Sequence, residues 1–292
     1  MALQTLINGI AVGGIYALIA IGYSLVFSIL RVVNFAHGSL YMIGAFGGLI
    51  LSHRLGLPFW VAFLGGLAAA SLAAVFVERV ASAPLRKRGA SPMAFLISTL
   101  GMQLLLDTSG LITMGGETHP FPPPVANRTF HLLGATFTLY EVLILAVTVV
   151  LLLALELFLT RTRTGMAIRA TAQNPLAAGL MGVNVNRVNA ITFAIAGALG
   201  AAAGIMVGIY YNSVYPTMGA VAGMKGFAAA ILGGLGSISG AVVGGLVLGV
   251  IENFGTTLLG SGLRDITAFL VMILVLVIRP SGLLGLPVRE KV

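Results

Sequence analysis

Glu252 and Asn253 are the residues of this chain best placed to do chemistry, because they lie inside a long apolar run. A carboxylate in hydrocarbon is costly unless it has a partner or lines a cavity, so it indicates a functional site by default. A transport pathway is one interpretation of the pair. A hydrogen bond between two helices explains it about as well.

Catalytic and metal-binding patterns are absent from the sequence. It contains no HExxH or GxSxG motif, no clustered set of carboxylates and histidines, and no cysteine. A membrane-embedded enzyme is therefore disfavoured, and we expect no catalytic residues, no metal site and no cofactor bound by this chain. The four histidines are scattered among connections, at His37, His53, His119 and His131.

The glycine-rich run from Gly233 to Gly240 does not form a nucleotide-binding loop. Such a loop has the pattern GxxxxGK[ST], and that pattern occurs nowhere in the chain. The protein therefore cannot hydrolyse ATP by this route. So many glycines instead predict a turn or break between two helices.

Composition indicates that this is an integral membrane protein. Hydrophobic residues make up 58% of the chain and charged residues 8%, against roughly 45–50% and about 25% in soluble domains. The uncharged runs 2–30 and 188–224 exceed the about 20 residues that a helix needs to cross a bilayer. The sequence predicts an all-α, polytopic transmembrane helix bundle, with residues 1–292 forming one domain.

About eight to nine membrane segments are expected. The seventh has about 13 residues, which rise roughly 20 Å and fall short of a 30 Å hydrocarbon core, so it is a candidate half-helix or re-entrant segment. Nine crossings with an outside N-terminus and eight with an inside N-terminus both stay open. The expected spans lie near 6–30, 35–51, 58–82, 92–114, 139–160, 188–211, 223–235, 240–259 and 266–278.

Basic residues set the orientation of these spans. The net charge of +8 comes from short connections between apolar runs, at 86–88, 161–187 and 279–291. The positive-inside rule puts these connections in the cytoplasm and explains the charge more simply than nucleic-acid binding does. The proline-rich, nearly neutral stretch 115–138 is expected outside.

The segment 161–187 is a polar, basic interruption between two apolar runs. Asn174 suits a helix N-cap, Pro175 the first helical position and Gly182 the residue just past the helix end. A helix of about two turns is marginal alone in water, so it needs something to pack against. A partner protein is one candidate and the lipid surface another, although a lipid-bound helix would show a longer amphipathic face.

Small residues recur at four-residue spacing, as at Gly200, Gly204 and Gly208. They line one helix face and let helices approach closely in lipid. Close packing is the simpler interpretation, and a substrate path or hinge is the other. Polar and aromatic residues near span ends add further candidates for a translocation path, which together are Asn34, His37, Tyr211, Asn212, Glu252 and Asn253.

Several short motifs, in this order and spacing, resemble one family. They are Tyr16-Ala17-Leu18, Gly22, Asn34-Phe35-Ala36-His37-Gly38, Tyr41-Met42, Ala222-Gly223-Met224-Lys225, Leu232-Gly233-Gly234-Leu235-Gly236-Ser237 and Pro280-Ser281-Gly282-Leu283-Leu284-Gly285. They look like the LivH-type permease subunits of bacterial branched-chain amino-acid ABC transporters, and the resemblance covers nearly the whole chain.

The resemblance implies a multi-pass subunit of the bacterial inner membrane. It would pair with a related second permease, two cytoplasmic ATPase subunits that bind ATP and Mg, and a periplasmic substrate-binding protein. Permeases for urea or short-chain amides, and an ion-coupled secondary transporter, stay as alternatives, although no convincing internal repeat is visible. By the resemblance, the ATPase-coupling residues are Met166, Arg169, Gln173, Asn174, Pro175, Leu176, Ala178, Gly179, Leu180, Met181 and Gly182.

Overall fold

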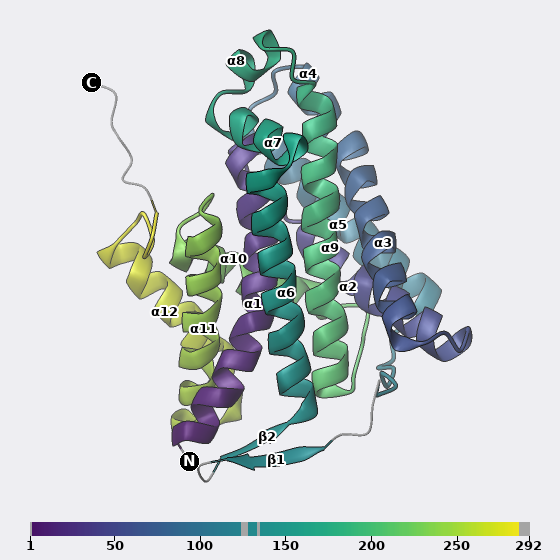
Figure 1. Cartoon of the computed structure of the whole chain (residues 1–292), viewed down its shortest axis with the longest axis vertical. Coiled ribbons are helices and arrows are strands. Elements are labelled where there is room, and N and C mark those ends of the chain that lie inside the picture. The colour runs from purple at the N-terminus through teal and green to yellow at the C-terminus, as the bar shows by residue number, and fades with distance from the viewer. Residues whose placement is uncertain (1, 124–127, 133–134, 286–292) are drawn as a thin grey trace.

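A computed structural model of the chain describes residues 2–123, 128–132 and 135–285. Helices run mainly along one long axis, and a small antiparallel hairpin closes one end (Figure 1). The helical bundle expected from composition is confirmed. Its elements are α1 (Ala2–Leu30), α2 (His37–Leu49), η1 (Ile50–Arg54), α3 (Phe59–Val77), η2 (Glu78–Ser82), α4 (Ala83–Lys87), α5 (Pro92–Met114), β1 (Thr129–Leu132), β2 (Ala135–Thr138), α6 (Leu139–Arg161), α7 (Arg163–Gln173), α8 (Pro175–Leu180), α9 (Val185–Tyr211), α10 (Met218–Gly233), α11 (Ile238–Leu259), η3 (Ser261–Leu263) and α12 (Arg264–Ile278).

Within the described ranges, six helices are long and apolar enough to cross a membrane. The other three predicted spans are α2, α10 and α12, with 13, 16 and 15 residues, and η1 extends α2 by five more. At 1.5 Å per residue these segments cover roughly 23–27 Å, less than the 30 Å core. By length the structure therefore supports six full crossings, and the prediction of eight to nine exceeds that number. The six are Ala2–Leu30, Phe59–Lys87, Pro92–Met114, Leu139–Arg161, Val185–Tyr211 and Ile238–Leu259.

Helix α1 forms the centre of the bundle and packs against α6, α9, α10 and α11. Its sequence is apolar on all sides, and such a helix is stable only when other helices surround it. Helix α5 is different, since most of its side chains are exposed, and Leu104 is 69% exposed. The outer helices therefore present their apolar surface to lipid or to another membrane subunit.

The short helices α2 and α10 begin inside the bundle, where their first turns meet. A side chain added at Gly38 would collide with the carbonyl of Gly219, and one added at Gly219 with the carbonyl of Gly38. Each short helix follows a long one, α1 or α9, and these two start at opposite ends of the molecule (Figure 1). The structure thus contains a repeated long-then-short arrangement that was not visible in the sequence.

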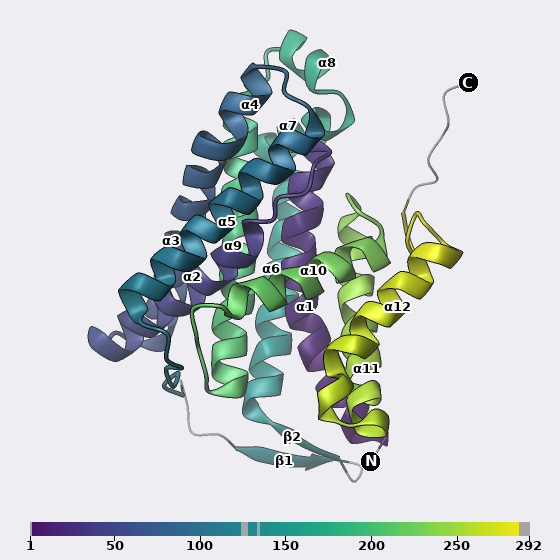
Figure 2. The ribbon, with the colours of Figure 1, turned by 180° about the vertical axis from the view of Figure 1, so that it is seen from behind.

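The predicted start of the seventh span, at residue 223, is wrong, because α10 begins at Met218. The residues before it are not helical. Asn212 ends α9 in the left-handed region with φ +50°, and Val214 pairs through its backbone with His119 in a bridge of 2.8 and 2.9 Å. Figure 2 shows this connection turning back from the end of α9 toward α10. Tertiary pairing, which no local pattern encodes, decides where this helix starts.

Close packing explains the glycine pattern, against neighbouring helices at Gly204 and Gly245 and against the connections that hold Phe121 and Val214 at Gly208. A side chain at Gly204 would collide with the carbonyl of Tyr41 on α2, and one at Gly245 with the backbone of Ala17 on α1. The break predicted for the run 233–240 is confirmed, since Gly234 and Gly236 have φ values of +109° and +86° between α10 and α11.

Candidate functional site

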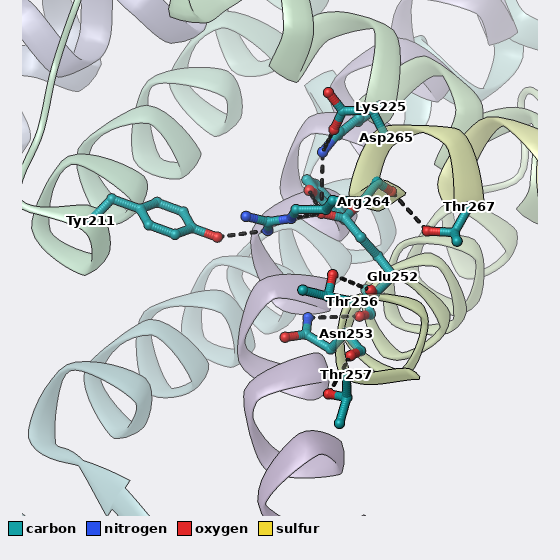
Figure 3. A network of polar contacts seen from close by, with 11 residues as sticks. Tyr211, Lys225, Glu252, Asn253, Thr256, Thr257, Arg264, Asp265 and Thr267 are labelled. Atoms are coloured by element: carbon teal, nitrogen blue, oxygen red, sulfur yellow. Dashed lines mark hydrogen bonds and ion pairs between the residues drawn. The ribbon is translucent and has the colours of Figure 1, made fainter. Parts of the chain in front are cut away.

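A cluster of four charged side chains joins α10, α11 and α12 (Figure 3). Glu252 lies on α11 and Lys225 on α10, while Arg264 and Asp265 begin α12. The cluster depends on the turn at Gly260, whose φ of +94° lets the chain reverse between α11 and α12. Three helices thus place opposite charges within ion-pair distance.

Glu252 is the acceptor at the centre of this cluster, and its side chain is fully buried. Its Oε1 accepts hydrogen bonds from the Tyr16 hydroxyl at 3.0 Å, from Lys225 Nζ at 3.1 Å and from Arg264 Nε. Lys225 Nζ also lies 2.6 Å from Asp265 Oδ1, and Arg264 Nη2 donates to the Tyr211 hydroxyl at 2.6 Å. The three contacts to Glu252 offset part of the cost of a carboxylate in an apolar medium, but all of them involve Oε1, and Oε2 is buried with no hydrogen-bond partner among the described residues.

A cavity of about 400 Å³ adjoins the cluster. Lys225 and Arg264 line it, whereas their acidic partners Glu252 and Asp265 do not. Apart from Ser213, the rest of the wall is aromatic and apolar, and includes Tyr16, Tyr41, Tyr211, Val12, Ile15 and Val221. The cavity therefore presents two cations among mainly aromatic and apolar side chains.

The predicted path residues separate into different places. Tyr211 and Glu252 come together, because Arg264 bonds to both. Asn253 does not join them, since its amide donates to the Gly249 carbonyl of its own helix at 2.9 Å. Asn212 serves as the exposed end of α9.

Asn34 and His37 form a second buried site, where α2 begins. The His37 ring packs edge-on against Tyr23, with centroids 4.7 Å apart, and fits into the space left by Gly22 and Gly200. The side-chain amide of Asn34 is buried and has no hydrogen-bond partner among the residues that the structure describes. Neither residue lines the cavity beside Lys225.

Three members of the charge cluster, Lys225, Arg264 and Asp265, were not predicted as functional, and neither was Tyr16, which donates to Glu252. One signal was available, because Lys225 is the only charged residue between positions 188 and 251. Its pairing with Glu252 was not predictable, since Lys225 and Glu252 lie 27 residues apart and Tyr16 and Glu252 lie 236 apart. In the described part of the chain, no group of three or more metal-ligating side chains is present.

The segment 161–187 forms two helices, α7 and α8, at the end of the molecule opposite the β hairpin (Figure 1). Asn174 caps α8, since its Oδ1 accepts from the backbone N–H groups of Leu176 and Ala177 at 3.0 Å each. Pro175 is the first helical residue, and Gly182 has φ +86° just beyond the helix. The predicted short helix is confirmed, with α7 preceding it.

Apolar side chains project from α8 with little to cover them. Leu176, Leu180 and Met181 are 75%, 83% and 85% exposed. Of the predicted coupling residues, Ala178 alone is buried, at 5% exposure, because residues two apart on a helix point to opposite sides. Ala178 therefore lies on the inner side of α8, opposite its exposed apolar residues. The exposed ones are Met166, Arg169, Gln173, Asn174, Pro175, Leu176, Gly179, Leu180, Met181 and Gly182.

Known proteins match this chain over nearly its whole length. The family model described as "Branched-chain amino acid transport system / permease component" matches residues 5–276. The permease BraD of Pseudomonas aeruginosa is 40% identical over 99% of this chain and 98% of its own. LivH of Escherichia coli K12 is 38% identical over 99% of this chain and 97% of its own; both relatives are named as high-affinity branched-chain amino acid transport system permease proteins.

The fold also has a counterpart among solved structures. PsaBC from Streptococcus pneumoniae, solved in complex with Fab, aligns with a TM-score of 0.50 and 16% identity, covering 96% of this chain and 92% of its own. At that identity the likeness concerns the fold alone. The family match and the two relatives together establish that this chain belongs to the branched-chain amino acid transport permease family.

Proposed function

We propose that the chain is the membrane-spanning permease subunit of an ATP-driven importer of branched-chain amino acids in the bacterial inner membrane, with residues 1–292 acting as one permease domain. The observation that carries this proposal is the 38–40% identity, over 99% of the chain, to permeases named for these substrates. The six long apolar helices support a multi-pass membrane subunit.

The proposed partners are a related second permease, two cytoplasmic ATPase subunits that bind ATP and Mg, and an extracytoplasmic substrate-binding protein. Two features support a separate ATPase. The sequence lacks a nucleotide-binding loop, and α8 exposes three large apolar side chains. Basic α4, which contains Arg86 and Lys87, lies at the same end as α8 (Figure 1), in keeping with a cytoplasmic location.

The proposed coupling is mechanical. Gly165 of α7 lies so close to Leu159 of α6 that an added side chain would collide with the α6 backbone, and α7 also contacts α1 and α9. Movement of α7 and α8 with a docked ATPase would therefore move these long helices as one body. Rigid-body rotation of such a group opens a path on alternate sides of the membrane.

Uptake measurements test the substrate. Membrane vesicles that contain the complete transporter and its binding protein should take up leucine, isoleucine and valine when ATP is supplied. Uptake of urea or acetamide in preference to these amino acids would support the alternative substrate class instead. Uptake that needs an ion gradient and proceeds without ATP would contradict the ABC importer.

A further inference from the structure

We infer that the cavity beside Lys225 and Arg264 is a site for the zwitterion of the transported amino acid, with the two cations receiving its carboxylate. The inference rests on the proposed function and adds a place inside the permease where the substrate is recognised. The cavity volume of about 400 Å³ lies within the roughly 300–1,000 Å³ range of small-ligand sites.

Both cations keep donors that the ion pairs do not use. Lys225 has three N–H donors, and its ion pairs with Glu252 and Asp265 use two of them, which leaves one. Arg264 has five, and its bonds to Glu252 and Tyr211 leave three. Lys225 and Arg264 line the cavity while the two acids do not. A carboxylate in the cavity can accept from both cations in charge-assisted hydrogen bonds.

Charge balance favours a zwitterion over a simple anion. Lys225 and Arg264 carry two positive charges, and Glu252 and Asp265 carry two negative charges, so the cluster is already neutral. A lone carboxylate would add an uncompensated charge to an apolar site, which is costly. A zwitterion brings its own ammonium group and leaves the site neutral.

The other walls suit the remaining parts of a branched-chain amino acid. Tyr41 and Tyr215 line the cavity with aromatic rings, whose faces attract an ammonium group, whereas the Tyr211 ring already has the Arg264 guanidinium over it, 5.5 Å from its centroid. Apolar side chains from three helices, including Ile15 of α1, Val207 of α9 and Val221 of α10, supply contacts for an aliphatic side chain. Ser213 and Tyr215 follow the end of α9, which lies at the hairpin end of the molecule, where the proposed binding protein would deliver substrate (Figure 1).

Thiol protection tests occupancy of the cavity. The chain has no cysteine, so Ser213→Cys provides a single thiol at the cavity wall. Ser109→Cys, beside a different hollow on α5, is the matched control. In vesicles with the complete transporter, leucine should slow labelling of the Ser213→Cys thiol several-fold and leave the control unchanged. Leucinamide, which lacks the carboxylate, and 4-methylpentanoate, which lacks the ammonium group, should protect far less.

Equal protection by all three compounds would overturn recognition of a zwitterion, and no protection by leucine would overturn the site.

A second measurement compares Val221→Trp, which is designed to fill the cavity, with Val150→Trp on the exposed face of α6. Val221→Trp should lower leucine uptake about tenfold and lower it more than alanine uptake. An unchanged ratio of leucine uptake to alanine uptake in Val221→Trp would contradict the inference. The proposed function fails separately, if the unmodified transporter takes up no leucine.

Discussion

At the scale of single residues, Glu252 is a buried carboxylate that several helices hold in place. It is fully buried, and one of its oxygens accepts from Tyr16, Lys225 and Arg264. Removing one member of a buried ion pair leaves its partner charged and poorly solvated. The strongest effect on stability is therefore expected at Glu252.

Glu252→Gln should lower the free energy of unfolding by up to about 3 kcal/mol, the lower end of the cost of breaking a buried pair. The expected loss of stability lies at the lower end of this range because Lys225 keeps its contact with Asp265. Thermal unfolding of the purified chain in lipid nanodiscs measures the change. Asn253→Ala is the matched neighbour and should cost about 1 kcal/mol or less, because only one bond within its own helix is lost. Equal stability of Glu252→Gln and the unmodified chain would contradict the role of this carboxylate.

At the scale of elements, α8 depends on its cap. The six-residue helix has few hydrogen bonds of its own, and Asn174 Oδ1 satisfies two backbone N–H groups that would otherwise have no partner. The proposed ATPase contact therefore depends on the Asn174 side chain, which stabilises α8, as well as on the apolar residues that touch the partner.

Asn174→Ala should destabilise α8 by about 1 kcal/mol and reduce co-purification of the ATPase several-fold, while membrane insertion of the permease stays normal. Asn174→Asp retains the capping oxygen and should retain the ATPase. If both variants lose the ATPase equally, the side chain itself makes the contact and the capping role is wrong.

Gly179 tests the contact surface itself. A Cβ atom added there meets nothing within 4 Å, and its helix neighbours Leu180 and Met181 are exposed, so Gly179→Trp should leave the permease folded and block ATPase docking. Gly116→Trp, on an exposed loop after α5, is the control. Normal ATPase assembly and transport by Gly179→Trp would argue against docking at α8.

The α1–α11 packing is the other element-scale constraint. Gly245→Leu should prevent recovery of a monodisperse protein in size-exclusion chromatography, because its side chain would collide with the backbone at Ala17. Gly101→Leu, at an exposed position where an added Cβ atom meets nothing within 4 Å, should behave like the unmodified chain. Equal recovery of both variants would show that α1 and α11 can separate without loss of the fold.

At the scale of the whole molecule, the hairpin and the α7–α8 unit lie at opposite ends (Figure 1). This arrangement fits the expectation that 115–138 is outside and 161–187 is inside. The N-terminal end of α1 lies at the hairpin end, which agrees with the outside N-terminus that nine crossings require. Three of those nine segments, α2, α10 and α12, are too short to span the membrane by themselves.

Labelling with a membrane-impermeant maleimide checks the two sides. In intact spheroplasts it should react with Glu117→Cys and not with Met181→Cys, both at exposed positions. In inverted vesicles the pattern should reverse. Reaction of both thiols from the same side would exclude the proposed orientation.

The sequence by itself determined the features that depend on neighbouring residues. Uncharged runs place the long helices, and 92–114 coincides with α5. The ends of α8 follow from Asn174, Pro175 and Gly182, and the glycines between 233 and 240 interrupt the helix between α10 and α11. Each signal acts within a few residues, through backbone freedom, local capping or the length of an apolar run.

Only the tertiary structure decided which distant residues meet. It joined Lys225, Glu252 and Arg264, excluded Asn253 from that group, and set the first turns of α2 and α10 against each other. It also buried Ala178 among exposed neighbours. These outcomes depend on how helices rotate and cross in lipid. In that medium every face of an apolar helix looks alike in sequence, so packing of small residues and pairing of a few charges select one arrangement.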